Sequence, residues 1–213
     1  MRRTKVAAEQ TRARILDAAE RVFFEQGVAR STLDQIARAG AVTRGAIYWH
    51  FENKADLFNA VVERVRMPME STLHRLLETA ETLDDLEAHC TTALLELHQD
   101  ARLRRVYTIL LLKCEHTEDM AEMVAREQSI KEEIIKSLTR FFTRLRERDL
   151  VTYAGEPRIL AVSLYAYMAG LHIDYLGSPH LYHMPEDASA LVGIFFAPLK
   201  KAGAKHDNHE SLR

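Results

Sequence analysis

Residues 43–50 hold the side chains best suited to chemistry in this chain. They combine hydrogen-bond donors, aromatic rings and one cation without a carboxylate, and they are Thr43, Arg44, Gly45, Tyr48, Trp49 and His50. Donors on such a surface reach the base edges and phosphates of a DNA major groove. On spacing alone, Trp49 is equally suited to packing in a core, and helix-turn-helix geometry also occurs in proteins that bind no DNA.

Elsewhere the chain offers no arrangement typical of catalysis or metal binding. Cys114, Glu115 and His116 are adjacent. Adjacent residues of a helix diverge by about 100°, so these three cannot chelate one ion. His180 and His183 fall in a predicted loop, where a solvated pair is favoured over a metal site. No glycine-rich phosphate loop is present, and we therefore expect no catalysis, no metal and no cofactor.

Two short helices must position residues 43–50. The apolar pattern predicts them at residues 33–39 and 43–50, with Ser31 or Thr32 capping the first and Thr43 capping the second. Helices of this length do not persist alone, because nucleating a helix is costly. A small core must therefore hold them. Its predicted members are Val22, Phe23, Leu33, Ile36, Ala37, Val42, Ile47, Phe51, Leu57 and Phe58.

The whole chain is predicted to be all-α, because its apolar residues recur with helical spacing and no segment is typical of a useful strand. Gly27 is the expected cap of the first long helix, and Pro68 should kink or divide another. The Glu-rich stretch 127–133 is typical of an exposed helix face, and the polar residues 203–213 predict a disordered tail. The predicted longer helices cover residues 9–26, 54–79, 84–99, 101–116, 118–148, 156–176 and 186–201.

The distribution of charge divides the chain near residue 54. Residues 1–54 carry ten Lys and Arg against six Asp and Glu, while the remainder carries 19 against 25. A basic segment on an acidic body indicates that only the first part faces a polyanion. We accordingly place a DNA-binding domain at residues 1–54 and a second helical domain at residues 55–202. No low-complexity linker separates them, so the first should pack directly on the second.

The sequence also bears on where the protein resides. No apolar run reaches about 18 residues, so we expect no membrane partner. The basic N-terminus lacks a following apolar stretch and is not a secretory signal. Without such a signal, Cys90 and Cys114 are expected to be reduced thiols in a cytoplasmic protein.

Residues 32–57 resemble the signature of the TetR family of transcriptional repressors. The likeness is carried by Thr32-Leu33, Ile36-Ala37, Val42-Thr43-Arg44-Gly45-Ala46-Ile47-Tyr48-Trp49-His50-Phe51, Asn53-Lys54 and Leu57. With Arg2-Arg3-Thr4-Lys5 and Lys113-Cys114-Glu115-His116-Thr117-Glu118, the chain is most similar to the branch of multidrug-efflux repressors that includes AcrR, TtgR and MtrR.

The resemblance implies which residues contact DNA. Arg44 is expected to read base edges, with Gly45 allowing close approach, and Tyr48 to contact bases or the backbone. Trp49 shares their outward face. Phosphate contacts are assigned to Thr32, Thr43, His50 and Lys54. A mobile arm formed by Arg2, Arg3 and Lys5 is expected to add positive charge against the DNA without reading its sequence.

The turn between the two short helices departs from the family pattern. Members usually have Ala-Gly-Val, whereas this chain has Gly40-Ala41-Val42. If Ala41 adopts a left-handed conformation, it costs about 1 kcal/mol. The alternative is a turn rebuilt around Gly40, and either form leaves the docking angle of the second short helix open.

The resemblance further implies a cavity for a small hydrophobic effector among the long helices. Position 169 is Ala where relatives can carry an acid, and position 173 is Ile where they can carry Arg, so a more apolar pocket that is less suited to charged ligands is expected. Taken singly, each matching residue is as well explained as ordinary core. The matching positions are Val65, Cys90, Ala93, Tyr107, Leu111, Leu138, Tyr165, Met168, Ala169 and Ile173, with Cys114 and His172 one turn or less away.

The last two helices, residues 156–176 and 186–201, are expected to form a homodimer. The second has an apolar band too wide for a helix with one solvated face. Two such patches make a four-helix interface, and its two-fold symmetry matches a palindromic operator. The band consists of Ala188, Leu191, Val192, Phe195, Phe196 and Leu199.

The favoured function is a ligand-released repressor of a multidrug-efflux operon. A TetR-type regulator of lipid or amino-acid metabolism is the alternative within the same class. From another class, a helical enzyme or scaffold with a vestigial helix-turn-helix is disfavoured, because no catalytic group is evident and the donor-rich surface is intact.

Overall fold

The computed structural model describes residues 2–115 and 120–201, and within these ranges it is helical with no strand. The predicted tail at residues 203–213 lies outside the described residues. The all-α prediction is confirmed. The helices are α1 (Arg2–Gln26), α2 (Leu33–Ala39), α3 (Arg44–His50), α4 (Lys54–Thr79), α5 (Leu83–Gln99), α6 (Ala101–Leu112), α7 (Ala121–Glu147), α8 (Pro157–Gly177) and α9 (Asp187–Phe196), with 3-10 turns at Pro179–Leu181 and Ala197–Leu199.

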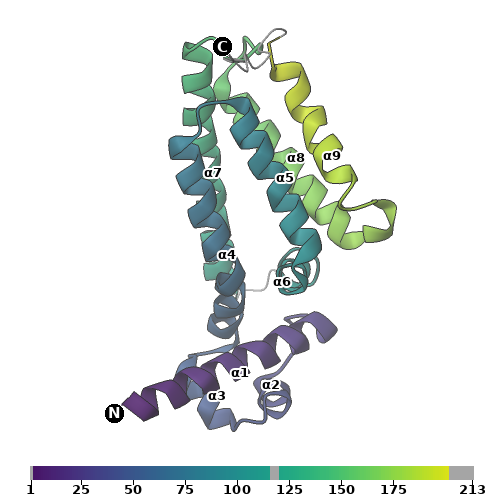
Figure 1. Ribbon diagram of the computed structural model, residues 1–213. Coiled ribbons are helices and arrows are strands. Elements are labelled where there is room, and N and C mark those ends of the chain that lie inside the picture. The colour runs from purple at the N-terminus through teal and green to yellow at the C-terminus, as the bar shows by residue number, and fades with distance from the viewer. Residues whose placement is uncertain (1, 116–119, 202–213) are drawn as a thin grey trace, which may run out of the picture.

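Figure 1 shows a small N-terminal unit below a taller bundle. Helices α1, α2 and α3 form the lower end, and α4 rises from them beside α7. Helix α6 lies across the middle of the molecule and packs on α1, α4 and α5. Helices α5, α7, α8 and α9 build the upper part, with α9 against α5. Helices α4 and α6 therefore connect the two parts.

Side-chain caps fix the starts of the two short helices. Thr32 Oγ1 accepts from Gln35 N at 3.2 Å, and Gln35 Oε1 accepts from Thr32 N at 2.8 Å, which makes a reciprocal capping box. Thr43 Oγ1 accepts from Ala46 N at 3.1 Å and caps α3. Ile36 and Ile47 are fully buried beneath these helices. Both predicted caps and the predicted small core are confirmed.

The turn between α2 and α3 keeps alanine in the left-handed region. Ala41 has φ 48°, whereas Gly40 ends α2 in the right-handed helical region. Glycine at position 40 allows α2 to pack closely on α1, since a Cβ there would lie 3.2 Å from Ala18 Cβ. The first of the two predicted turns is therefore the one that forms, and Ala41 carries its conformational cost.

Two apolar cores divide the molecule. The first runs from α1–α4 into α6, and its Phe23 and Phe58 rings meet edge to face at 5.6 Å. The second lies among α5, α7, α8 and α9 around Phe142 and Val192. Because Val106 of α6 belongs to the first core, the N-terminal helices pack directly on the body, as predicted. The domain boundary at residue 54 stays a prediction.

Several helix boundaries differ from the prediction. Helix α1 begins at Arg2 rather than at residue 9, because no breaker interrupts residues 2–8. Lys5 is thus an exposed helical residue and not part of a mobile arm. The side chains of Arg2 and Arg3 lie outside the described residues.

The effects of two prolines on helix length differ from the prediction. Helix α4 runs undivided through position 68, with α6 and α7 packed along it. Helix α9 stops at Phe196 instead of continuing to residue 201, because Pro198 supports only a tighter 3-10 turn. Helix α6 also ends before the predicted residue 116, at Leu112, where an irregular segment begins without a proline.

Helix α8 corrects the expectation about apolar runs. Its 21 residues are long and apolar enough to cross a membrane by length and composition alone. Of the 18-residue stretch that meets this criterion, 22% is buried within the described chain. Few charges interrupt it, since Arg158 and Asp174 are its ionised side chains. The helix packs on α7 and α6 and therefore belongs to the bundle, with a large apolar face left uncovered.

Candidate DNA interface and ligand cavity

The outward face of α3 carries the predicted base-reading residues together. Arg44 Nη2 lies 3.0 Å from Tyr48 Oη, and its guanidinium sits 5.5 Å from the Tyr48 ring centre. Its Nη1 pairs with Asp34 Oδ2 of α2 at 3.3 Å. Solvent screens an exposed pair of this kind, so Arg44 can exchange Asp34 for a DNA contact at little cost. Trp49 is 72% exposed, which excludes a core role for it in this chain.

Gly45 leaves the α3 backbone open to approach. A Cβ at this position would meet nothing nearer than Thr43 Oγ1, at 3.9 Å. Both residues lie at the exposed N-terminus of α3. A phosphate or a base edge can therefore approach the backbone closely there.

Arg12 of α1 is a cation near this face that sequence reasoning missed. Its guanidinium lies 5.2 Å from the centre of the Phe51 ring. Partial burial and the charge of Arg12 together lower the pKa of His50, whose ring contacts that of Trp49 at 4.5 Å. Arg12 is far from α3 in sequence, so only the packing of α1 against α3 reveals it.

Lys54 has a structural role beside its predicted one. Its Nζ donates to the carbonyl oxygens of Val28, Ala29 and Ser31 at 2.9, 3.0 and 3.1 Å. These bonds tie the start of α4 to the loop between α1 and α2, and they use the three protons of the ammonium group. Its contact with a phosphate stays a prediction.

A cavity of about 410 Å³ lies among helices α4 to α8, and we call it the main cavity. Ten of the twelve predicted ligand residues line it, from four helices. These are Cys90, Ala93, Tyr107, Leu111, Leu138, Tyr165, Met168, Ala169, His172 and Ile173.

Two predicted ligand residues do not line the main cavity. Val65 is 8% exposed and packs in the first core, because the adjacent Arg66 occupies the cavity-facing side of α4. Cys114 packs at the edge of the same core, in the irregular segment after α6. His116 lies outside the described residues. No group of three potential metal ligands occurs within residues 2–115 and 120–201.

Charged side chains line the end of the main cavity between α4 and α7, where the sequence indicates only a more apolar pocket. Arg66 is 5% exposed and pairs with Glu63, Glu70 and Glu127, a set that we call the Arg66 cluster. Arg66, Glu70 and Glu127 line the main cavity. The spacing of Glu63, Arg66 and Glu70 along one helix face is a sequence signal that identifies most of this cluster. The partner on α7, Glu127, is therefore more than part of an exposed acidic face.

Burial disfavours the charged form of four further groups that line the main cavity. Burial raises the pKa of Cys90 and of Tyr107 to about 12. It lowers the pKa of His89 and of His172. His172 Nδ1 lies 2.6 Å from the Met168 carbonyl oxygen, which can only accept, so the ring donates there and its Nε2 is an acceptor.

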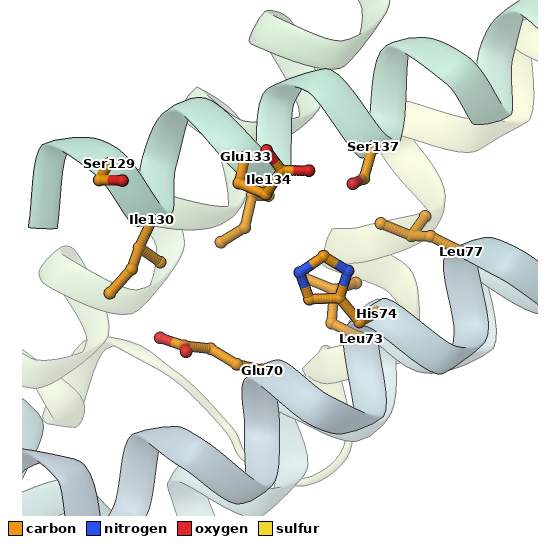
Figure 2. Close-up of a pocket in the computed structure, with 9 residues that line it drawn as sticks. All are labelled: Glu70, Leu73, His74, Leu77, Ser129, Ile130, Glu133, Ile134 and Ser137. Atoms are coloured by element: carbon orange, nitrogen blue, oxygen red, sulfur yellow. The ribbon is translucent and has the colours of Figure 1, made fainter. Parts of the chain in front are cut away.

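A second cavity of about 170 Å³ lies between α4 and α7. Figure 2 shows His74 of α4 in its centre, with Glu133 and Ser137 on α7 above it. The second cavity and the main cavity share part of their walls. The shared residues are Glu70, Leu73, Ile130 and Ile134.

Ion pairs join the N-terminal unit to the body at what we call the α1–α6 junction. Glu20 of α1 is 3% exposed and pairs with Arg105 at 2.8 Å and Arg102 at 3.3 Å, both on α6. Asp17, one turn earlier on α1, pairs with Arg102 at 3.1 Å and with Arg64 of α4 at 2.9 Å. Helix α1 is thus fixed to both connecting helices.

Two family models together match most of the chain. Residues 15–61 match the family model of bacterial regulatory proteins of the tetR family. Residues 81–201 match the C-terminal region of MAATS-type transcriptional repressors. ArpR of Pseudomonas putida, a probable HTH-type transcriptional regulator, is 41% identical over 80% of this chain and 82% of its own length.

Solved structures agree with the sequence matches. NalD, the secondary repressor of the MexAB-OprM multidrug efflux pump in Pseudomonas aeruginosa, superposes with a TM-score of 0.85 at 38% identity, covering 92% of this chain and 98% of NalD. The complex of SmeT with triclosan gives a TM-score of 0.79 at 32% identity, covering 91% and 93%. SmeT is the repressor of the Stenotrophomonas maltophilia pump SmeDEF. The chain therefore belongs to the tetR family of bacterial regulatory proteins, as a transcriptional repressor related to multidrug-efflux regulators and not an enzyme.

Proposed function

We propose that this protein represses a multidrug-efflux operon and is released from its operator by a small hydrophobic or aromatic molecule bound in the main cavity. The observation that carries this proposal is the position of α6. Tyr107 and Leu111 of α6 line the main cavity, while Arg105 of the same helix pairs with Glu20 of α1. A ligand that displaces α6 therefore also displaces the helix on which α2 and α3 pack.

Helix α4 supplies a second connection. Lys54 begins it beside the α1–α2 loop, and Arg66 reaches the main cavity three turns later. A ligand releases the operator only if it prefers a conformation in which the two α3 helices of a dimer no longer match half-sites about 34–36 Å apart. Displacement of α4 and α6 together favours such a conformation.

The dimer is proposed to form through α8 and α9. Ile159 on α8 and Ile194 on α9 are 45% and 67% exposed in the single chain. Exposed apolar surface of this extent is typical of an interface. Tyr167 of α8 stacks on Phe195 of α9 at 5.8 Å, which joins the two helices into one surface.

DNA contacts are proposed for the exposed residues at α3 and its surroundings. Arg44 and Tyr48 are assigned to bases, and Thr32, Thr43 and His50 to phosphates. Lys5 on α1 adds charge without reading sequence.

The test measures operator binding by fluorescence anisotropy. The probe is the DNA upstream of the protein's own gene, and a scrambled duplex is the control. Hydrophobic drugs and aromatic compounds are then titrated into the complex. We expect selective binding to the upstream DNA and its loss with at least one ligand class. Binding that no ligand reverses, with ligands shown calorimetrically to occupy the cavity, would reject the release mechanism.

A further inference from the structure

The lining of the main cavity contains more acid than base. Three carboxylates and one guanidinium line the cavity, namely Glu70, Glu96, Glu127 and Arg66. With neutral histidines their sum is a net charge of −2, and Glu63 behind them shares its charge with Arg66 and the more exposed Arg126. A low-dielectric site with excess negative charge attracts cations and repels anions.

The guanidinium is already committed to carboxylates. Arg66 contacts Glu63, Glu70 and Glu127 and is buried among them. An anionic ligand would gain one shared cation and meet three nearby acids. Arg66 therefore does not make this cavity a site for acids.

One carboxylate oxygen of Glu70 lacks a hydrogen bond, although 29% of the side chain is exposed. Its Oε1 is buried without a hydrogen-bond partner, although Arg66 Nε lies 3.2 Å away in ion-pair contact. Burial raises the pKa of Glu70, so its charge is incompletely compensated. A buried acceptor in this state is stabilised by an added donor, and a charged donor stabilises it most.

The rest of the main cavity suits an apolar or aromatic body. Leu110, Leu138 and Met168 form its walls, and the rings of Tyr107 and Tyr165 face the same space. Aromatic rings also attract cations through their faces. Carboxylates at one end and apolar and aromatic walls elsewhere match a molecule that is cationic at one end and apolar at the other.

We propose that the effector is an apolar or aromatic amine whose ammonium group binds Glu70 and Glu127 while its body fills the main cavity. This inference rests on the proposed function, because it assigns a ligand class to the same cavity. Figure 2 shows Glu70 projecting from α4 into the space between α4 and α7, below Ile130. Its carboxylate therefore lies between α4 and α7, the two helices that form the charged end of the main cavity.

The experiment uses three probes that share one ring system and differ in charge. They are 1-naphthylmethylamine, 1-naphthylmethanol and 1-naphthoate, titrated calorimetrically into the full-length protein. We expect the amine to bind about tenfold more tightly than the alcohol, and the carboxylate more weakly than the alcohol. Glu70→Gln and Glu127→Gln should each reduce the preference for the amine and leave the affinity for the alcohol nearly unchanged.

Glu133→Gln is the matched control, because Glu133 faces only the second cavity and pairs with Lys136 and Arg140. It should keep the full preference for the amine. Equal binding of the three probes, tighter binding of the carboxylate, or no binding of any probe would overturn the proposed ligand class.

Operator release separates this proposal from the proposed function. If the amine binds preferentially but leaves the operator complex intact, the ligand class stands and the release mechanism fails. If the alcohol or the carboxylate binds best and releases DNA, the release mechanism stands and the cationic effector is wrong.

Discussion

Arg105 on α6 donates from Nε to Oε1 of Glu20 on α1 at 2.8 Å, across the boundary between the helix-turn-helix unit and the ligand-binding body. The carboxylate is buried, while Arg105 is partly exposed. Further along α6 from Arg105, Leu110 and Leu111 line the main cavity. The pair thus joins α1 of the N-terminal unit to a cavity-lining helix.

Glu20→Gln should weaken this connection without changing the side-chain volume. We expect a loss of stability of about 1–2 kcal/mol in urea denaturation, discounted for the partial exposure of both arginines. Ligand should then weaken operator affinity less than it does in the unaltered protein. The coupling free energy between two such sites is usually about 1–3 kcal/mol, and the variant should show a smaller value. Glu25→Gln, an exposed change on the same helix, is the control. Unchanged coupling in Glu20→Gln would place the transmission in α4 alone.

Arg44→Ala should weaken binding to the operator and relax base preference by about 1–3 kcal/mol. The reason is that Arg44 is the long cationic donor on the exposed face of α3. Competition between operator and scrambled duplexes measures the selectivity. A variant with the affinity and selectivity of the unaltered protein would remove base reading from Arg44.

Phe195→Asp should give monomers with much weaker operator binding, because each half-site contact is feeble without its partner. Ile194→Asp is the gentler variant, since a residue that is 67% exposed can be changed without disturbing the fold of a single chain. Sedimentation velocity and anisotropy follow both effects. Two folded variants that still sediment as dimers would move the interface away from α9.

Ala169→Trp should fill the main cavity, which Ala169 lines. We expect the ligand response to be blunted and operator affinity to be retained. Calorimetry of ligand binding with and without operator DNA checks the coupling directly, because two coupled sites must weaken each other equally. Equal ligand affinities in the two titrations would show that the cavity and the DNA face are independent.

Cys90 should resist alkylation in the folded protein, because burial raises the pKa of its thiol to about 12 and only the thiolate reacts. Cys114 is half-buried and should react first at pH 8, although burial raises the pKa of its thiol as well. Mass spectrometry after timed iodoacetamide treatment gives the order. Faster labelling of Cys90 would mean that the main cavity opens to solvent far more than its walls indicate.

Local rules were enough to predict most of the helices and the DNA face. The caps at Thr32 and Thr43 and the Gly27 cap with φ 79° depend on neighbouring residues, and all three were predictable. Most lining residues of the main cavity were predicted from the resemblance, because they stand at positions that match pocket residues of the efflux-repressor branch.

The charged networks were not predictable in the same way. Glu20 and Arg105 are 85 residues apart in sequence, and Arg66 and Glu127 are 61 apart. Each pair forms because two helices pack in one particular register, which helical periodicity does not specify. The expectation of a more apolar pocket considered positions 169 and 173 and did not include Arg66, Glu70 and Glu127, which also line the cavity.

The left-handed Ala41 also affects how often the helix-turn-helix opens. Its strain of about 1 kcal/mol is released when the turn unfolds locally, so the open state is populated about fivefold more than it would be with glycine at this position. The amide of Val42, which donates to the Ala37 carbonyl oxygen at 3.0 Å, is exposed to solvent in that open state. Amide hydrogen exchange in this turn is therefore faster by the same factor, and the DNA-reading unit is less rigid than the family pattern would make it.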